Sequence, residues 1–192
     1  MAEILEESSN LESVTVDINR TSATVKGGRR MSFAALVVVG DRRGSVGIGY
    51  GKAPGVPAAI EKAQKDARKR IQRVRLRAGT LPHPVTGKFG TSSVRLIPAA
   101  PGTGISAGGT VRAVLEMAGI HDCLTKSYGS RNQANLCKAV MGGLMAVRTR
   151  DEVAELRGVT LDKTSVEEKI EKGERFMPKV AAGAQKAEAP RN

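Results

Sequence analysis

The chain has 192 residues and a formal net charge of +12, a length that suits one domain or two small ones with a substantial core. Such an excess of positive charge favours a polyanion as partner. No apolar run in the sequence reaches the 18 or more residues that a membrane span needs, and the acidic N-terminus is the opposite of the basic start of a signal peptide. The composition therefore predicts a cytoplasmic protein with no membrane partner.

The charge is unevenly distributed along the chain. The first 13 residues hold four glutamates and no Lys or Arg, whereas residues 14–80 hold 15 basic and only 4 acidic side chains. Residues 149–192 are neutral overall. Because the positive charge lies in the middle of the chain and not at its ends, the pattern favours an anion-binding surface on a folded domain over a basic disordered tail. The ends themselves, 1–13 and about 178–192, are expected to be flexible.

Strand-forming patterns follow the acidic start. Val14, Val16 and Ile18 alternate with polar residues, the apolar run 33–39 predicts a second strand, and the alternation at 46–50 predicts a third. Gly, Asp and Arg at 40–44 are typical of a turn between the last two strands. Glycines leave one face of the third strand nearly bare, which indicates that another backbone packs closely there.

A basic, glycine-rich loop, KGGRR at 26–30, precedes the second strand. Two adjacent glycines allow the backbone to approach a flat partner closely. Lys26, Arg29 and Arg30 supply charge and hydrogen-bond donors for phosphate. The loop therefore predicts a nucleic-acid contact that is anchored on the sheet.

Residues 57–74 are predicted to form a helix with two different faces. Apolar side chains recur at helical spacing, at Ile60, Ala63, Ala67, Ile71 and Val74. Basic side chains follow the same spacing about 200° around the helix, at Lys62, Lys65, Lys69 and Arg73. We expect the apolar stripe to pack on the sheet and the basic ridge to face a polyanion. An ordinary solvated helix face is the alternative.

The stretch 79–84 is expected to be a linker or domain junction, with a second unit beyond it. The predicted elements of this unit are a strand at 93–97, a Pro/Gly-rich turn at 98–109, a helix at 111–118, a strand at 120–127 and a helix at about 132–148. A capping box at Thr149 and Glu152 opens a short helix that Gly158 closes, and residues 164–167 start another.

Two glycine-rich motifs partly match nucleotide-binding loops. GTGISA at 102–107 fits the dinucleotide fingerprint, with Asp122 following Gly102 by 20 residues. However, Pro98 and Pro101 interrupt the strand-to-helix turn, and the chain is too short for a doubly wound sheet. GIGYGK at 47–52 resembles a phosphate loop, but Val46 stands where that loop has its first glycine, and Ala53 stands where it has Ser or Thr. The first motif can still be a helix N-terminus that takes a phosphate or a partner's carboxylate.

No catalytic residue, metal site or cofactor is predicted. Cys123 and Cys137 are expected to be reduced and buried, and their spacing to His83 and His121 fits no usual zinc site. No nucleophile is identifiable beside His121 and Asp122. Three Phe, two Tyr and no Trp argue against bases stacked on a sheet. The residues alone thus predict a non-enzymatic RNA-binding protein.

A set of motifs follows in an order that is specific for one family. They are VKGGRR at 25–30, VVGD at 38–41, VGIGYGKA at 46–53, PAAIEKA at 57–63, PGTGI at 101–105, AGG at 107–109 and VLEMAG at 114–119. From about Val14 to Gly158 the chain closely resembles the bacterial small-ribosomal-subunit protein five family. It departs from the family pattern at Arg42, where Gly is usual in the turn, at the pair 54–55 and at Gln133, where Pro is frequent.

The resemblance implies an α+β fold of two small domains. An N-terminal domain at 14–77 would be like a double-stranded-RNA-binding domain, with a three-stranded sheet and one helix. After a linker at 78–84, a C-terminal domain at 85–158 would have a left-handed β-α-β-α arrangement. Residues 1–13 would be an acidic tail, and 159–192 a partly flexible C-terminal extension.

The resemblance also implies a structural role in the ribosome and no enzymatic activity. Such a protein is expected to bind small-subunit ribosomal RNA at the junction of head and body, to contact ribosomal proteins four and eight, and to influence translational accuracy. It would help to line the path by which messenger RNA enters, and it would not form homo-oligomers. The residues expected to bind ribosomal RNA are Arg20, Lys26, Gly27, Gly28, Arg29, Arg30, Arg42, Arg43, Lys52, Lys62, Lys65, Lys69 and Arg73. Those expected to lie toward protein four are Gly102, Gly104, Gly108, Gly109 and Arg112.

An enzyme that acts on phosphorylated small molecules is the alternative from a different class. It would use the turn at 102–109 as an anion cradle.

Overall fold

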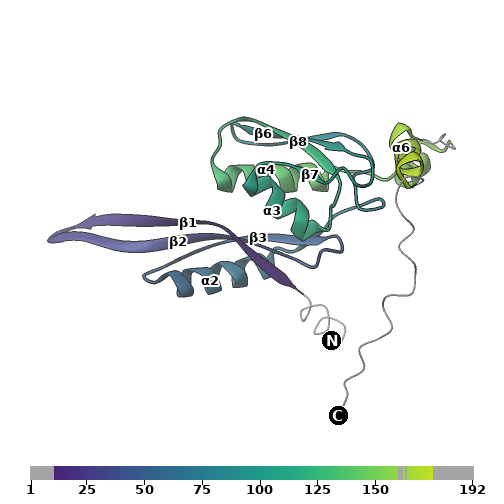
Figure 1. The fold of residues 1–192 in the computed structure, drawn as a ribbon. Helices are drawn as coiled ribbons and strands as arrows, with labels where there is room; N and C mark the ends of the chain where they lie inside the picture. Colours follow the sequence, from purple (N-terminus) through teal and green to yellow (C-terminus); the bar gives the residue numbers. More distant parts are fainter. Residues whose placement is uncertain (1–10, 160–161, 163, 175–192) are drawn as a thin grey trace, which may run out of the picture.

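The computed structural model describes residues 11–159, 162 and 164–174. They form two four-stranded sheets and five helices, so the predicted α+β class is confirmed. Figure 1 shows the first sheet and its helix on one side of the molecule, the second domain packed against that sheet, and a long hairpin that reaches out beyond both. In the part of the chain that is described, no helix is long and apolar enough to span a membrane.

The first sheet is an antiparallel meander in the order β1-β2-β3-β4. Its strands are β1 (Glu12–Val25), β2 (Gly28–Gly40), β3 (Ser45–Ala53) and the two-residue β4 (Gln72–Arg73). The sequence predicted three shorter strands, and the N-terminal tail was expected to reach residue 13, two places into β1. Most residues of 19–32 are polar and exposed. They lack an apolar alternation because the hairpin there has no core to face, and the strands continue through their pairing.

Helix α2 (Val56–Lys69) packs on this sheet through small residues on both sides. Its buried positions are Ala59, Ala63 and Ala67, and they lie against alternate glycines of β3. A Cβ at Gly49 would overlap the carbonyl oxygen of Ala63, and Gly47 and Gly51 are equally close to the helix. The expected close backbone approach on the glycine face of this strand is therefore confirmed.

The helix ends five residues before the predicted boundary at 74. After Lys69 the chain turns back, β4 pairs with the start of β3, and the Val74 N–H donates to the carbonyl of Gly44. Pairing with a neighbouring strand satisfies these backbone groups, although the apolar spacing of Ile71 and Val74 continues the helical pattern. Arg73 accordingly lies in a strand, and the basic ridge of α2 is shorter than predicted.

The second sheet has the order β5-β6-β8-β7. Its strands are β5 (Val85–Phe89), β6 (Ser92–Pro98), β7 (Ile105–Ser106) and β8 (Cys123–Gly129), and helices α3 (Gly109–Ala118) and α4 (Gln133–Met145) cover one face. β5 and β7 were not predicted. Both are short, and the alternation of β5 is interrupted by a glycine that packs against α4. A Cβ at that glycine, Gly87, would overlap the carbonyl oxygen of Ala139. The strand predicted at 120–127 begins and ends later, and the helix predicted at 132–148 ends three residues earlier.

Two short helices follow, α5 (Arg150–Arg157) and α6 (Ser165–Glu174). The predicted capping box is present, since the Glu152 N–H donates to the Thr149 hydroxyl and the Thr149 N–H donates to the Glu152 carboxylate. Gly158 ends α5 with φ 63°, as expected. The predicted helix start at 164–167 is also confirmed. The tail predicted at about 178–192 lies outside the described residues.

The larger of two hydrophobic clusters joins the two domains, and the smaller one lies between the first sheet and α2. Alternate residues of β2 point to opposite sides, so Val37 packs toward α2 whereas Leu36 and Val38 pack with Val114 and Met117 of α3. This two-sided burial explains why the run 34–39 is continuously apolar rather than alternating. The expected linker at 78–84 is an ordered part of the junction, in which Leu81 is fully buried.

Candidate nucleic-acid interface

The basic glycine loop is the tip of the long β1–β2 hairpin. Only Lys26 and Gly27 form the turn, whereas Arg29 and Arg30 already belong to β2 and point to opposite faces of the ribbon. Gly27 has φ 113°, and a Cβ on it would meet nothing within 4 Å. The tip thus stands away from the rest of the protein, with its three cations exposed in several directions.

Two further predicted cations lie on opposite faces of the first sheet. Arg20 pairs with Phe33, on the face that α2 covers, and Lys52 pairs with Ala34, on the other face. Both side chains are exposed. The sheet therefore offers positive charge on both sides rather than on one continuous surface.

The basic ridge of α2 is present in shortened form. Lys62, Lys65 and Lys69 are exposed and lie on the side of the helix opposite to its buried alanines. Asp66 does not neutralise them, because its carboxylate forms an ion pair with Arg70 at 3.1 Å and accepts the Tyr50 N–H. The ridge is free to contact an external anion.

Arg42 and Arg43 lie in the turn between β2 and β3. Asp41 closes this turn by accepting the N–H groups of Arg43 at 2.7 Å and Ser45 at 2.9 Å. Burial alone would raise the pKa of Asp41, but these hydrogen bonds outweigh it and hold the pKa below its usual value. Arg42 has φ 55°, which glycine adopts more readily, and its guanidinium pairs with Glu12 at 2.7 Å.

The predicted RNA-binding residues therefore do not form one compact patch. The hairpin tip and the Arg42 turn lie at opposite ends of β2, whose 13 residues span about 40 Å at strand geometry. Arg73, opposite Ser45, lies at the Arg42 end. An RNA that used all of these residues would have to run along the length of the first domain.

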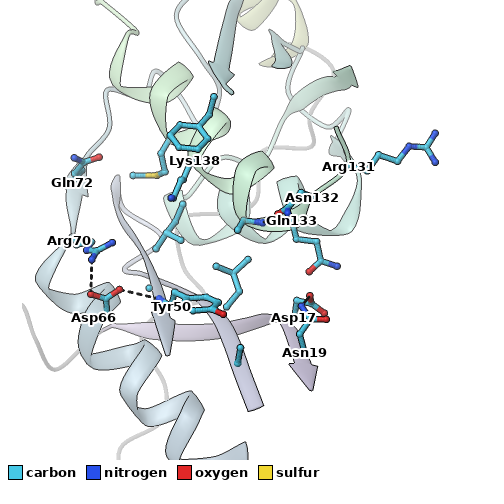
Figure 2. Close-up of a pocket in the computed structure, with 17 residues that line it drawn as sticks. Asp17, Asn19, Tyr50, Asp66, Arg70, Gln72, Arg131, Asn132, Gln133 and Lys138 are labelled. Carbon is cyan, nitrogen blue, oxygen red and sulfur yellow. Dashed lines mark hydrogen bonds and ion pairs between the residues drawn. The ribbon is translucent and has the colours of Figure 1, made fainter. Parts of the chain in front are cut away.

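A cleft of about 1080 Å³ is lined by residues of both domains, and the sequence did not predict it. Figure 2 shows Tyr50, Asp66 and Arg70 on the first-domain side, and Asn132, Gln133 and Lys138 on the other side. Tyr50 is 54% exposed and Phe89 is 42% exposed, and the Lys138 ammonium lies 4.8 Å from the centre of the Phe89 ring. Its lining residues come from seven elements, so no local pattern could have revealed them.

The cleft is lined mainly by polar and charged side chains. Its charges are mixed, because Asp17 and Asp66 line it together with Arg70, Arg131 and Lys138, and no Ser, Cys or His is among its lining residues. Within the described residues, the buried Oε1 of Gln133 has no hydrogen-bond partner. The lining residues contain no nucleophile with an adjacent base.

The glycine-rich segment at 102–109 is a surface turn rather than a dinucleotide loop. Gly102 and Gly104 have φ 84° and 75°, and the short strand β7 separates them from α3. Asp122, only 9% exposed, accepts the Gly104 N–H at 2.8 Å, so its position 20 residues after Gly102 has a structural cause. A Cβ on either glycine, or on Gly108 or Gly109, would meet nothing within 4 Å, which leaves this surface open.

Arg112 is bound within its own chain. Its Nη2 donates to the carbonyl of Ile105 at 2.8 Å, and its Nε lies 3.5 Å from the Glu116 carboxylate. The side chain remains about half exposed. Its predicted contact with another protein stays a prediction, and such a contact would have to compete with Glu116.

The two cysteines lie in the same hydrophobic cluster. Cys123 and Cys137 are fully buried, and burial raises the pKa of their thiols to about 11 and about 12. The His83 Nε2 accepts the Arg148 N–H at 3.2 Å. Among the described residues, no three His, Cys, Asp or Glu side chains are placed to hold a metal ion.

These features define a two-domain α+β protein whose first domain is a basic sheet-and-helix unit with a projecting hairpin. Residues 11–75 match the N-terminal domain of ribosomal protein S5, and residues 87–157 match its C-terminal domain. The chain belongs to the ribosomal protein S5 family, as its motifs indicated.

Two relatives illustrate the degree of similarity. The small ribosomal subunit protein uS5 of Vibrio cholerae is 50% identical over 159 residues, which cover 83% of this chain and 95% of that protein. The protein of the same name from Rhodopirellula baltica is 54% identical over 147 residues, or 77% of this chain and 83% of that protein.

Proposed function

We propose that the protein is a structural component of the small ribosomal subunit and that it binds the RNA of that subunit. Membership of the ribosomal protein S5 family and the names of the two relatives support this role. The predicted cations of the first domain would bind the ribosomal RNA where the head and the body of the small subunit meet. Because the hairpin projects beyond the packed body, it can reach between RNA segments that the body itself does not touch.

The observation that carries the proposal is the lack of internal partners for these cations. Of the predicted basic residues, Arg42 alone forms an ion pair with a carboxylate in the part of the chain that is described. Exposed cations without counter-charges repel one another and are favoured when they neutralise phosphates.

Contacts with ribosomal proteins four and eight, an influence on translational accuracy and a place beside the incoming messenger RNA belong to the same proposal. The open glycine surface at 102–109, with Arg112 at its edge, is the side that would face protein four. Glycines without neighbours let a partner's backbone come close.

A salt titration tests RNA binding by the first domain. The full chain is bound to a transcript of small-subunit ribosomal RNA, and log K is plotted against log salt. The ridge variant K62Q/K65Q/K69Q and the tip variant K26Q/R29Q/R30Q should each lower the steepness of this plot by about 2–3, since each phosphate contact contributes about 0.7–0.9.

The control variant R148Q/R157Q/K172Q removes the same charge from exposed positions outside the first domain. It should leave the slope nearly unchanged. If the tip and ridge variants behave like this control, the first domain does not bind RNA through these residues.

The alternative, an enzyme with an anion cradle at 102–109, is not supported. The Gly104 N–H is already bound to Asp122, and the guanidinium of Arg112 is turned to Ile105 and Glu116.

A further inference from the structure

We propose that the uncovered face of the second sheet is a second RNA-binding surface, which contacts phosphates independently of the first domain. The inference rests on the proposed function, because it takes RNA as the partner. The surface, here called the open face, consists of alternate residues of β5, β6 and β8: Thr86, Lys88, Ser93, Arg95, Ile97, Leu124, Lys126 and Tyr128.

The strand register places these residues on one side. Arg95 lies directly between Thr86 of β5 and Lys126 of β8, and Ser93 lies between Lys88 and Tyr128. Their neighbours in sequence point to the other side, where Val94 and Leu96 are fully buried against the helices. Figure 1 shows α3 and α4 on that side only, between the two sheets. No described element covers the open face.

The open face carries positive charge without any negative charge. Lys88, Arg95 and Lys126 are exposed, and none of them forms an ion pair within the described part of the chain. The segments that build the second sheet, 85–106 and 123–129, contain no Asp or Glu at all. This differs from α2 and α5, where acidic residues are interspersed with the basic ones.

The pairing of Arg95 with Lys126 is the most informative contact. Two like charges directly opposite on neighbouring strands, with Cβ atoms about 5 Å apart, destabilise a sheet. Nothing in the described fold compensates for this repulsion. A phosphate placed between the two side chains would turn the repulsion into two charge-assisted hydrogen bonds.

The apolar residues of the open face favour nucleic acid as the occupant. Tyr128 is 52% exposed and Leu124 is 40% exposed, and both lie beside Lys126 on the same strand. A single exposed ring next to cations suits contact with a ribose or an unstacked base. The face has too few apolar residues for a stable protein–protein core, and its uniform charge matches a phosphate backbone.

The salt titration described above tests this proposal with one more variant of the full chain. The open-face variant K88Q/R95Q/K126Q should lower the slope of log K against log salt by about 2–3 relative to the control variant R148Q/R157Q/K172Q. Its thermal midpoint should not fall, because the substitution also removes the repulsion between Arg95 and Lys126.

Tyr128→Leu should weaken binding several-fold without changing the slope, whereas Tyr128→Phe should bind like the original chain.

The outcomes separate this proposal from the function on which it rests. If the ridge and tip variants lose slope and the open-face variant matches the control, RNA binding stands and the open face does not bind RNA. The open face would then contact an acidic protein or only solvent. If none of the three variants loses slope, the proposed RNA binding itself fails.

A tethered cleavage probe gives an independent measurement. An iron chelate attached through Thr86→Cys should cut the ribosomal RNA transcript close to the open face. The native cysteines will not take up the label, because both are buried and their thiol pKa values are raised. The same label at Arg157→Cys serves as the matched control, and cleavage no stronger than that of the control would overturn the proposal.

Discussion

The backbone N–H of Arg42, in the β2–β3 turn of the first domain, donates to the carbonyl of Met117 at 3.1 Å, in the last turn of helix α3. In the same turn, the Gly44 N–H donates to the carbonyl of Ala118 at 3.0 Å. The last carbonyls of a helix have no partner within the helix. Here one domain supplies the donors that the helix of the other domain requires, so the two domains form one body.

Substitution of Gly40 is expected to disturb this junction. A Cβ at Gly40 would overlap the Met117 carbonyl, which belongs to backbone rather than to the end of a flexible side chain. Gly40→Ala should lower the free energy of unfolding by roughly 1–3 kcal/mol, as overpacking usually does. Gly142→Ala in α4, where a Cβ has ordinary room, should instead be neutral or stabilising by about 0.5–1 kcal/mol. Urea unfolding of the two variants tests the difference, and equal stabilities would contradict it.

Acid is expected to release helix α6. The Thr164 N–H bonds to the Glu167 carboxylate, and ion pairs with Arg150 at 3.1 Å and Arg77 at 3.0 Å add to it; together they lower the pKa of Glu167 from its usual 4.5. A lowered pKa in the folded state means that the carboxylate stabilises the fold above pH 4.5 and that this contribution is lost as the pH falls through the lowered value. Carboxyl NMR titration should give a midpoint below 4.5, with the amide signals of α6 following it.

The variant Glu167→Gln should show the released state of α6 already at neutral pH. Glu168→Gln is the matched control, since the Glu168 side chain is exposed and lies in the same first turn of α6. If both variants keep the neutral-pH signals of α6, Glu167 does not hold this helix.

Removal of the Asp122 carboxylate is expected to loosen the 102–104 turn. Asp122→Ala leaves the Gly104 N–H without its acceptor and should cost about 1–3 kcal/mol of stability. Asp122→Asn retains an acceptor oxygen and should cost clearly less. Chemical denaturation compares the two, and equal losses would mean that the hydrogen bond to Gly104 does not matter.

The hairpin tip is expected to be mobile in the free protein and ordered on RNA. No side chain pins Gly27 or Gly28, whereas residues 34–40 of the same strand are buried. Backbone NMR order parameters at 26–30 should be lower than those at 34–40, and they should rise when the RNA transcript binds. Order parameters at the tip as high as those of the buried part of β2 would refute this expectation.

Arg112→Glu is expected to affect assembly with ribosomal protein four. The substitution places two carboxylates one helical turn apart at 112 and 116 and removes the cation offered to the partner. It should weaken co-purification with protein four and change misreading, while the salt slope of RNA binding stays close to that of the unchanged protein. Normal assembly and fidelity would show that this segment is not the interface. Arg148→Glu is a control for charge reversal elsewhere.

Local chemistry determined much of this protein from the sequence. The β2–β3 turn, the stop of α3 at Gly119 and the capping boxes at Thr149 and Thr164 depend on neighbours in the chain, and each was predicted within a few residues. The ordered set of glycine motifs also identified the family. These glycines are required where backbones meet, as at Gly49 against Ala63.

The remaining features depend on strand pairing and packing between segments that are distant in the sequence. The helical spacing of Ile71 and Val74 gave way to a strand because β3 offered hydrogen bonds to β4. The cleft beside Tyr50 and the alignment of Arg95 with Lys126 depend on strand register and domain packing, which place residues from distant segments together. Because a shift of one residue would move every side chain to the other face of its sheet, only the tertiary structure establishes which cations share a surface.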